Sequence, residues 1–183
     1  MMEPEANAAR PGNLNGTAQV FADVYHNASK PAAVRGVVTN VSNYNGYNLT
    51  KAPVYAGTSP NWDEARFHAA LKPFLDNLGF PSHFIVDQGR SGQQPGGRPA
   101  WGNFCNIVKS GFGTRPTNAT GTEMLDAVVW VKPGGESDGT SDESSKRYDT
   151  HCRSEVSTIP APEAGEWFQE YFVMLLENAV PSF

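Results

Sequence analysis

The stretch Ala127-Val128-Val129-Trp130-Val131 is a short apolar run that leads directly into the polar segment Lys132-Pro133-Gly134-Gly135-Glu136-Ser137-Asp138-Gly139. The apolar run predicts a buried strand, and the glycines predict a loop at the strand's C-terminal end. The same order of strand and polar loop occurs at residues 34–46 and again at residues 83–92. These units decide the fold class, because each one places polar side chains where a strand ends.

Helical patterns alternate with these strands. Apolar residues at helical spacing predict helices over residues 17–27 and 163–178, and acidic residues after positions 59–61 predict a third helix that ends near residues 78–79. Pro73 is expected to kink or divide that third helix. The first dozen residues are predicted to be coil. Alternating strands and helices favour βα units on a parallel sheet, with the chemistry at the C-terminal ends of the strands.

The amino-acid composition narrows the classes of protein to which the chain can belong. The chain has 183 residues, of which 39% are hydrophobic, enough for one globular domain with a core. A formal net charge of -5 and a pI near 5.3 argue against a nucleic-acid partner. No stretch approaches the roughly 18 apolar residues of a membrane span, so no membrane partner is expected. Residues 1–9 lack the basic and apolar regions of a signal peptide.

Glycosylation motifs and cysteines favour an oxidising compartment and therefore an extracellular protein. Asn-x-Ser/Thr acceptors lie at Asn15, Asn27, Asn40, Asn48 and Asn118, although chance occurrence in a chain rich in Asn, Ser and Thr is the alternative. The two cysteines, Cys105 and Cys152, show no CxxC pattern and no cluster of histidines around them, so a zinc site is not expected. One disulfide or two buried free thiols are both compatible with this spacing.

Two strand-end loops hold charged residues that could perform chemistry. Lys132, Glu136 and Asp138 lie within seven residues, and grouped carboxylates in a cleft act as general acids, bases or hydrogen-bond partners of sugar hydroxyls. A solvated acidic turn is the alternative for this loop. Asp87 and Arg90 could form a fixed ion pair, or Asp87 could simply accept backbone N–H bonds in a structural turn.

Polar and aromatic loop residues offer further contacts for a sugar. Asn43, Tyr44 and Asn45 carry amide and phenol groups suited to hydroxyls, but they are also ordinary turn residues. Trp101 and Phe104 could stack on pyranose rings, or they could pin their loop to the core. P-loop and HExxH motifs are missing from the sequence, and we expect neither a cofactor nor a metal.

Taken in order, these motifs resemble those of glycoside hydrolase family 6, the cellobiohydrolases and endoglucanases that cut β-1,4-glucan with inversion. The matching stretches are Val34-Arg35-Gly36, residues 39–46, residues 87–92, Trp101-Gly102 with Cys105, residues 111–113, residues 129–142 and Trp167-Phe168-Gln169. The resemblance implies that residues 11–183 are the C-terminal half of a catalytic domain and that residues 1–10 are coil outside the family pattern. The implied fold is α/β, the C-terminal part of a distorted (β/α) TIM-like barrel, with parallel strands, flanking helices and an incomplete barrel.

The same resemblance assigns roles to individual residues. Asp138 stands at the position of a carboxylate proposed as the base or its electrostatic equivalent, with Arg90 as its ion-pair partner. The implied substrate-binding residues are Lys132, Glu136, Asn43, Trp101 and Phe104, the last of which stands where the cellobiohydrolases usually carry a stacking tryptophan. Cys105 and Cys152 stand where the family's second disulfide lies.

The expected activity is hydrolysis of β-1,4-glucosidic bonds in cellulose or its oligosaccharides. An inverting glycosidase also needs a protonated carboxylic acid, which the family supplies from its N-terminal half. Hydrolysis by this chain alone is therefore expected to be weak or absent. The alternatives are a non-catalytic glucan-binding or partner-binding half domain and a fragment without independent function.

Overall fold

The computed structural model describes residues 11–94 and 97–183, so the predicted coil at residues 1–10 lies outside the described residues. The elements in chain order are α2 (Pro11–Asn27), β1 (Gly36–Thr39), η1 (Val54–Ala56), α3 (Glu64–Asn77), β2 (His83–Asp87), β3 (Leu125–Val129), η2 (Thr150–Arg153) and α4 (Gln169–Glu177). Helices η1 and η2 are short 3-10 turns.

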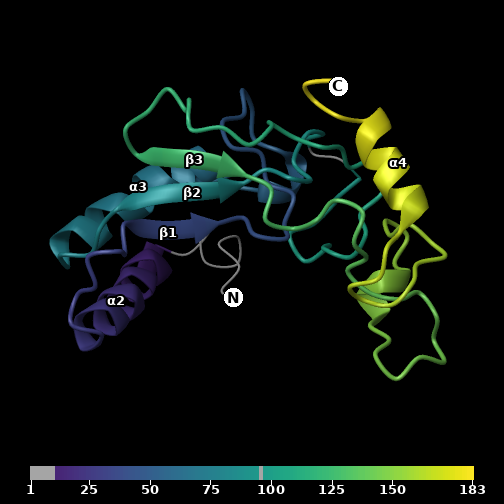
Figure 1. The fold of residues 1–183 in the computed structure, drawn as a ribbon, viewed down its shortest axis with the longest axis horizontal. Helices are drawn as coiled ribbons and strands as arrows, with labels where there is room; N and C mark the ends of the chain where they lie inside the picture. Colours follow the sequence, from purple (N-terminus) through teal and green to yellow (C-terminus); the bar gives the residue numbers. More distant parts are fainter. Residues whose placement is uncertain (1–10, 95–96) are drawn as a thin grey trace.

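The strands form one parallel sheet in the order β1-β2-β3, with Val37 beside Phe84 and Asp87 beside Val129. Within the described residues β1 and β3 are both edge strands, so the sheet is not closed (Figure 1). The predicted α/β fold with parallel strands, flanking helices and an incomplete barrel is confirmed. Parallel pairing places the C-terminal ends of the strands, and the loops that follow them, at one edge of the sheet.

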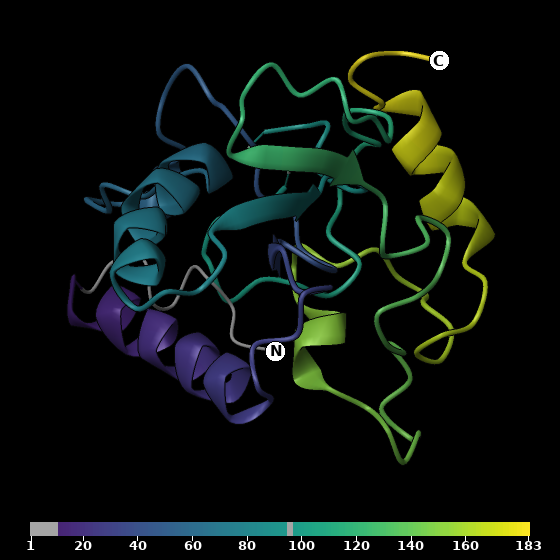
Figure 2. The same ribbon diagram turned by 60° about the vertical axis from the view of Figure 1, so that its left-hand side comes forward.

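Helices α2 and α3 lie side by side and cover one face of this sheet (Figure 2). Successive strand side chains point to opposite faces, so Phe84 and Val86 meet the helices while Ile85 points away. Together with residues from the helices they form the larger apolar cluster: Leu14, Ala18, Ala22, Phe67, Leu71, Leu75, Phe80, Phe84, Val86, Leu125 and Val128. This cluster holds the strands that position the polar loops.

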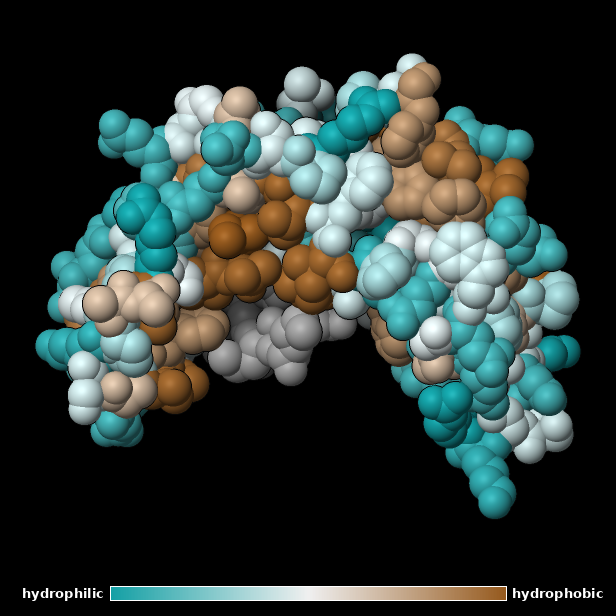
Figure 3. All heavy atoms as spheres, viewed as in Figure 1, coloured by the Kyte–Doolittle hydropathy of each residue, from teal (hydrophilic) through white to brown (hydrophobic). Residues whose placement is uncertain are grey.

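The opposite face of the sheet is open. Val38 is 48% exposed, and it lines a shallow hollow together with Ile85 and Asp126. Figure 3 shows the molecule as an arch with apolar side chains on the sheet side of its hollow. Exposed apolar surface of this kind is unfavourable in water.

A second apolar cluster surrounds α4, at the end of the molecule away from α2 (Figure 1). Its buried members are Phe112, Ala161, Phe168, Tyr171, Leu175 and Ala179. Trp130 leaves the sheet to join this cluster: its ring stacks on Phe112 at 4.9 Å, and its indole N–H donates to the carbonyl of Thr114. β3 therefore ends at Val129, two residues earlier than predicted.

The bounds of the helices correct several predictions. α2 begins at Pro11 rather than at residue 17, since proline suits the first helical position. Pro73 lies within α3 without dividing it, on an exposed side where water can satisfy the freed carbonyl. The acidic stretch at residues 142–147 forms consecutive turns.

α4 begins at Gln169, six residues later than predicted. The reason is backbone pairing with the loop that follows β3. Two backbone hydrogen bonds join the segments at Ser137: Gly165 N donates to Ser137 O, and Ser137 N donates to Glu166 O. Phe168 N then donates to Gly135 O. These long-range bonds outweigh the local helical pattern.

Cys105 and Cys152 form a disulfide across a sequence separation of 47. We predict that Cys105→Ser lowers the free energy of unfolding by about 4 kcal/mol, because the unfolded chain gains loop entropy. Urea denaturation of the oxidised protein measures this loss, and Cys152→Ser should reproduce it. Equal stability of the wild type and both variants would contradict the prediction.

A buried polar layer lies where β1 ends. The imidazole of His68 stacks on Phe84 at 4.1 Å, and its Nε2 lies 2.7 Å from the hydroxyl of Thr39. Burial lowers the pKa of His68 to about 3, so it stays neutral beside Glu64. Burial raises the pKa of Glu64, although Asn45 donates to its carboxylate.

The neutral state of His68 predicts acid sensitivity. Between its unfolded pKa of about 6.5 and its folded pKa of about 3, only the unfolded chain binds the proton. This residue's contribution to stability is therefore fully present above about pH 6.5 and is lost as the pH falls toward 3, by about 1.4 kcal/mol per unit. Equilibrium unfolding of His68→Phe at several pH values should show a shallower slope than the wild type. The same slope in both proteins would show that His68 is not the titrating group.

Candidate functional site

The loops after the three strands meet around Asp87 and Asn40. The carboxylate of Asp87 accepts backbone N–H bonds from Ser42, Gly89 and Lys132. The side-chain amide of Asn40 donates to the backbone carbonyl of Asp87 at 2.7 Å. Asp87 is thus a structural acceptor that joins the loop after β1 to the loop after β3, the second of the two roles considered from the sequence.

Arg90 pairs with Asp138 rather than with Asp87. Its Nη1 lies 2.6 Å from Asp138 Oδ2, and the two side chains are only 1% and 10% exposed. The guanidinium also donates to the carbonyl of Ser42 and lies 4.2 Å from the ring centre of Tyr44. A buried cation is therefore fixed between the loops after β1, β2 and β3.

Asp138 Oδ2 accepts hydrogen bonds from three segments. The donors are the Tyr44 hydroxyl at 3.1 Å, Arg90 Nη1 at 2.6 Å and the Asn106 N–H at 2.9 Å. Lys132 Nζ lies 3.5 Å from the other oxygen, Oδ1. Burial by itself would raise the pKa of Asp138, but Arg90, the Asn106 N–H and Lys132 together hold it below its ordinary value. Asp138 is therefore a carboxylate, not a carboxylic acid, near neutral pH.

Lys132 and Glu136 form the more exposed part of the site. Lys132 Nζ lies 3.2 Å from Glu136 Oε2, and the Glu136 side chain is 35% exposed. Between them the chain passes closely beneath Trp167, where a Cβ on Gly135 would lie 2.1 Å from the indole ring. Only glycine allows this approach, which places Glu136 beside the start of the last helix.

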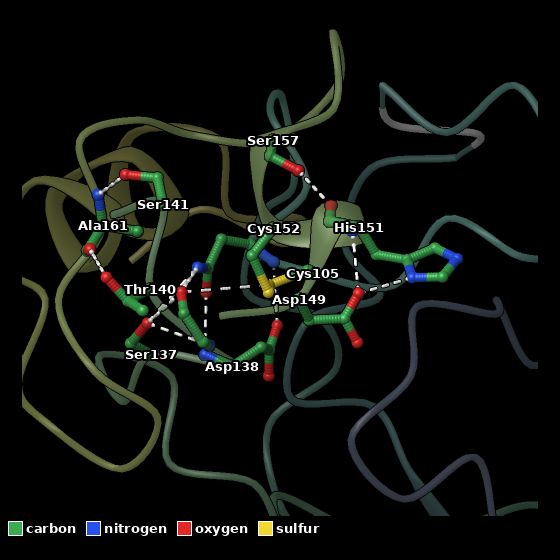
Figure 4. Close-up of a disulfide and its surroundings, with 12 residues drawn as sticks. Cys105, Ser137, Asp138, Thr140, Ser141, Asp149, His151, Cys152, Ser157 and Ala161 are labelled. Atoms are coloured by element: carbon green, nitrogen blue, oxygen red, sulfur yellow. Dashed lines mark hydrogen bonds and ion pairs between the residues drawn. A yellow bond between two sulfur atoms is a disulfide. The ribbon is translucent and has the colours of Figure 1, made fainter. Parts of the chain in front are cut away.

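The disulfide lies directly against this loop (Figure 4). Asn106, the neighbour of Cys105, is completely buried and has a left-handed backbone with φ of 46°. Its side-chain oxygen accepts the Asp138 N–H at 2.8 Å, and its amide donates to the carbonyl of Gly139 at 3.0 Å. The disulfide segment therefore holds both the backbone and the side chain of Asp138 by hydrogen bonds from Asn106.

The other residues considered from the sequence occupy two separate places. Asn43 is buried, and its side-chain oxygen accepts from Arg98 Nη1 at 2.6 Å. Trp101 lies near the same guanidinium and packs edge-on against Tyr55 at 4.6 Å. Asn43 and Trp101 thus belong to a cluster around Arg98 that pins the loop of residues 97–103.

Phe104 lies apart from that cluster, with its ring 5.1 Å from the imidazole of His151 near the disulfide. Sequence reasoning did not single out Asn106 or Tyr171, although both belong to the Asp138 network. Asn106 carries no motif beyond its position after Cys105. Tyr171 looked like one more apolar residue of the last helix.

The part of the chain that the structure describes holds no group of three or more His, Cys, Asp or Glu side chains able to bind a metal ion. None of its described helices is both long enough and apolar enough to cross a membrane. The charged groups that meet at Asp138 are its own carboxylate, the cations Arg90 and Lys132, and the partly exposed carboxylate of Glu136 beside Lys132.

Comparisons with known proteins point to one family. The family model described as "Glycosyl hydrolases family 6" matches residues 6–179. "Exoglucanase-6A" of Humicola insolens is 54% identical over 94% of this chain and 36% of its own length. "Probable 1,4-beta-D-glucan cellobiohydrolase C" of Aspergillus niger is 55% identical over 94% of this chain and 38% of its own length.

Solved structures give the same result. Cellobiohydrolase II (Cel6A) of Humicola insolens, in complex with glucose and cellotetraose, superimposes with a TM-score of 0.92 at 54% identity over 94% of this chain and 48% of that one. The catalytic core domain of Cel6A from Chaetomium thermophilum also gives 0.92 at 54% identity, over 93% and 48%. The chain therefore spans about half of these solved chains and little more than a third of the curated relatives.

Proposed function

The chain belongs to glycosyl hydrolases family 6, and from that premise we propose that it forms one side of a site that cleaves β-1,4-glucosidic bonds with inversion. The observation that carries this proposal is the Asp138 carboxylate, which is fixed by three donors and kept charged by Arg90. In the proposed domain arrangement, residues 11–183 are the C-terminal half of a catalytic domain.

Asp138 serves as the base or as its electrostatic equivalent. An inverting enzyme needs one carboxylate that activates water and one carboxylic acid that protonates the leaving oxygen. A carboxyl whose pKa is lowered cannot hold the proton of the acid. It can polarise a water molecule, and it can stabilise the positive charge that develops on the sugar in the transition state.

Lys132 and Glu136 bind hydroxyls of the glucan next to the cleavage point. Both side chains are polar and held close to Asp138, and Glu136 keeps part of its surface in contact with solvent. Phe104 offers an aromatic face near the disulfide, and Asn43 supports the cleft from its buried position beside Arg98. Related structures, one of them a complex with glucose and cellotetraose, support cello-oligosaccharides as the ligand class.

The acid is expected from outside this chain. Asp87, the other carboxylate at the strand ends, accepts three backbone N–H bonds and ties two loops together, which is not the setting of a proton donor. We therefore propose that hydrolysis by this chain alone is weak or absent. The same observation favours a second candidate function, a half domain that binds glucan without cleaving it.

An extracellular location is part of the proposal. The disulfide supports an oxidising compartment. Asn15, Asn27, Asn48 and Asn118 are exposed acceptors, whereas Asn40 is buried and donates to Asp87, so a glycan at Asn40 is not compatible with the fold.

Calorimetric titration with cellotetraose tests the glucan site. We predict that Glu136→Gln weakens binding about tenfold or more, because hydrogen bonds to a charged acceptor contribute about 1.5–3 kcal/mol. Glu123→Gln removes the same charge from an exposed loop and serves as the matched control. Failure of the wild type to bind, or equal losses in both variants, would contradict the proposed site.

A further inference from the structure

We propose that Tyr44 is a positioning residue that holds Oδ2 of Asp138 and so leaves Oδ1 as the oxygen presented to water or sugar. This inference rests on the proposed function and deepens it, because it names the carboxylate oxygen that contacts water or sugar. It also names the residue that holds the other oxygen. The argument depends on the direction of the hydrogen bonds around one buried phenol.

Tyr44 lies in the loop after β1 and is only 3% exposed. Its hydroxyl oxygen has three neighbours: Asp138 Oδ2 at 3.1 Å, the Tyr171 hydroxyl at 3.0 Å and the Ile107 N–H at 3.3 Å. A backbone N–H can only donate, and an ionised carboxylate can only accept. The single proton of Tyr44 therefore points to Asp138, and Tyr171 must donate its own proton to Tyr44.

The oxygen Oδ2 has no acceptor capacity to spare. Besides Tyr44 it accepts from Arg90 and from the Asn106 N–H, which is more than its two in-plane lone pairs readily accommodate. Oδ1 differs, because its near neighbour is Lys132 Nζ at 3.5 Å, an ion-pair distance rather than a close hydrogen bond. Oδ1 can therefore accept from a water molecule or a sugar hydroxyl.

Tyr44 also connects the carboxylate to the rest of the fold. Its ring lies beneath the guanidinium of Arg90 at 4.2 Å, and its hydroxyl is anchored from α4 by Tyr171. The charged groups around Asp138 are thus Arg90 and Lys132, with Glu136 against Lys132, and the two phenols complete the surroundings. A change in the hydroxyl of Tyr44 alters the hold on Oδ2 without removing either cation.

The phenol stays protonated throughout the range in which Asp138 titrates. Burial raises the pKa of Tyr44 well above its ordinary value; Arg90 opposes this, and Asp138 and Tyr171 reinforce it. Tyr44 is therefore a permanent donor, and its effect on Asp138 does not switch with pH.

The test compares Tyr44→Phe with Tyr171→Phe in the purified, oxidised chain. Both variants lose one hydroxyl from a buried ring, but only Tyr44 donates to the carboxylate. NMR of protein labelled with ¹³C at the aspartate carboxyls follows the titration of Asp138, whose resonance is identified by its loss in Asp138→Asn. The amide proton of Asn106, which donates to the same oxygen, is a second reporter at neutral pH.

In Tyr44→Phe we expect the pKa of Asp138 to rise by about one unit, because a donor to the charged form is lost. The Asn106 amide proton should move downfield at neutral pH as its bond to Oδ2 strengthens. Tyr171→Phe should give smaller changes in the same directions. An unchanged Asp138 titration and an unchanged Asn106 resonance in folded Tyr44→Phe would overturn the proposal.

If Tyr44→Phe does not fold, Tyr171→Phe serves as the test. A downfield shift of the Asn106 amide proton in that variant supports the proposal, and an unchanged resonance contradicts it. The measurement needs no turnover and no ligand. Failure of the wild type to bind glucan would therefore count against the proposed function, whereas these resonances test only the role of Tyr44.

Discussion

The structure depends on one buried ion pair, Arg90 with Asp138. Removing both charges from water costs several kcal/mol per ion, and the fold recovers this cost only if the remaining donors and acceptors are satisfied. Ser42, Tyr44 and Asn106 supply most of those partners from the loop after β1 and from the disulfide segment, whereas Arg90 Nε has no hydrogen-bond partner among the described residues. The pair therefore joins the loops after β1, β2 and β3 to the disulfide segment.

This arrangement gives the site its chemical character. A carboxylate held on one oxygen by a cation, a phenol and a backbone N–H is charged and rigid, which suits electrostatic stabilisation and the activation of water. It does not suit proton donation, and the strand-end Asp87 is committed to backbone contacts. The open sheet face with its exposed Val38 supports the proposal that the chain supplies one side of a larger site.

The sequence predicted the parts of the fold that local patterns determine. Apolar β-branched runs placed all three strands, and glycine-containing loops placed Lys132, Glu136 and Asp138 at one edge. Where the prediction was wrong, a long-range contact had overridden the local pattern: α4 starts late because residues 165–168 pair with residues 135–137. Asn106 and Tyr171 act through partners 32 and 127 residues away, which no local motif reveals. Arg98 brings Trp101 and Asn43 together, a contact between distant loops that no local motif reveals, and the role of these two residues in sugar binding stays a prediction.

The most direct test of this account is release of soluble cellobiose from amorphous cellulose by the purified chain, beside Asp138→Asn and the exposed control Asp142→Asn. The account predicts no release, or a trace that Asp138→Asn abolishes and Asp142→Asn leaves unchanged, because the chain provides the carboxylate side of the site without its acid. Sustained release by the wild type that requires Asp138 would contradict it, since a complete inverting pair would then lie within these 183 residues.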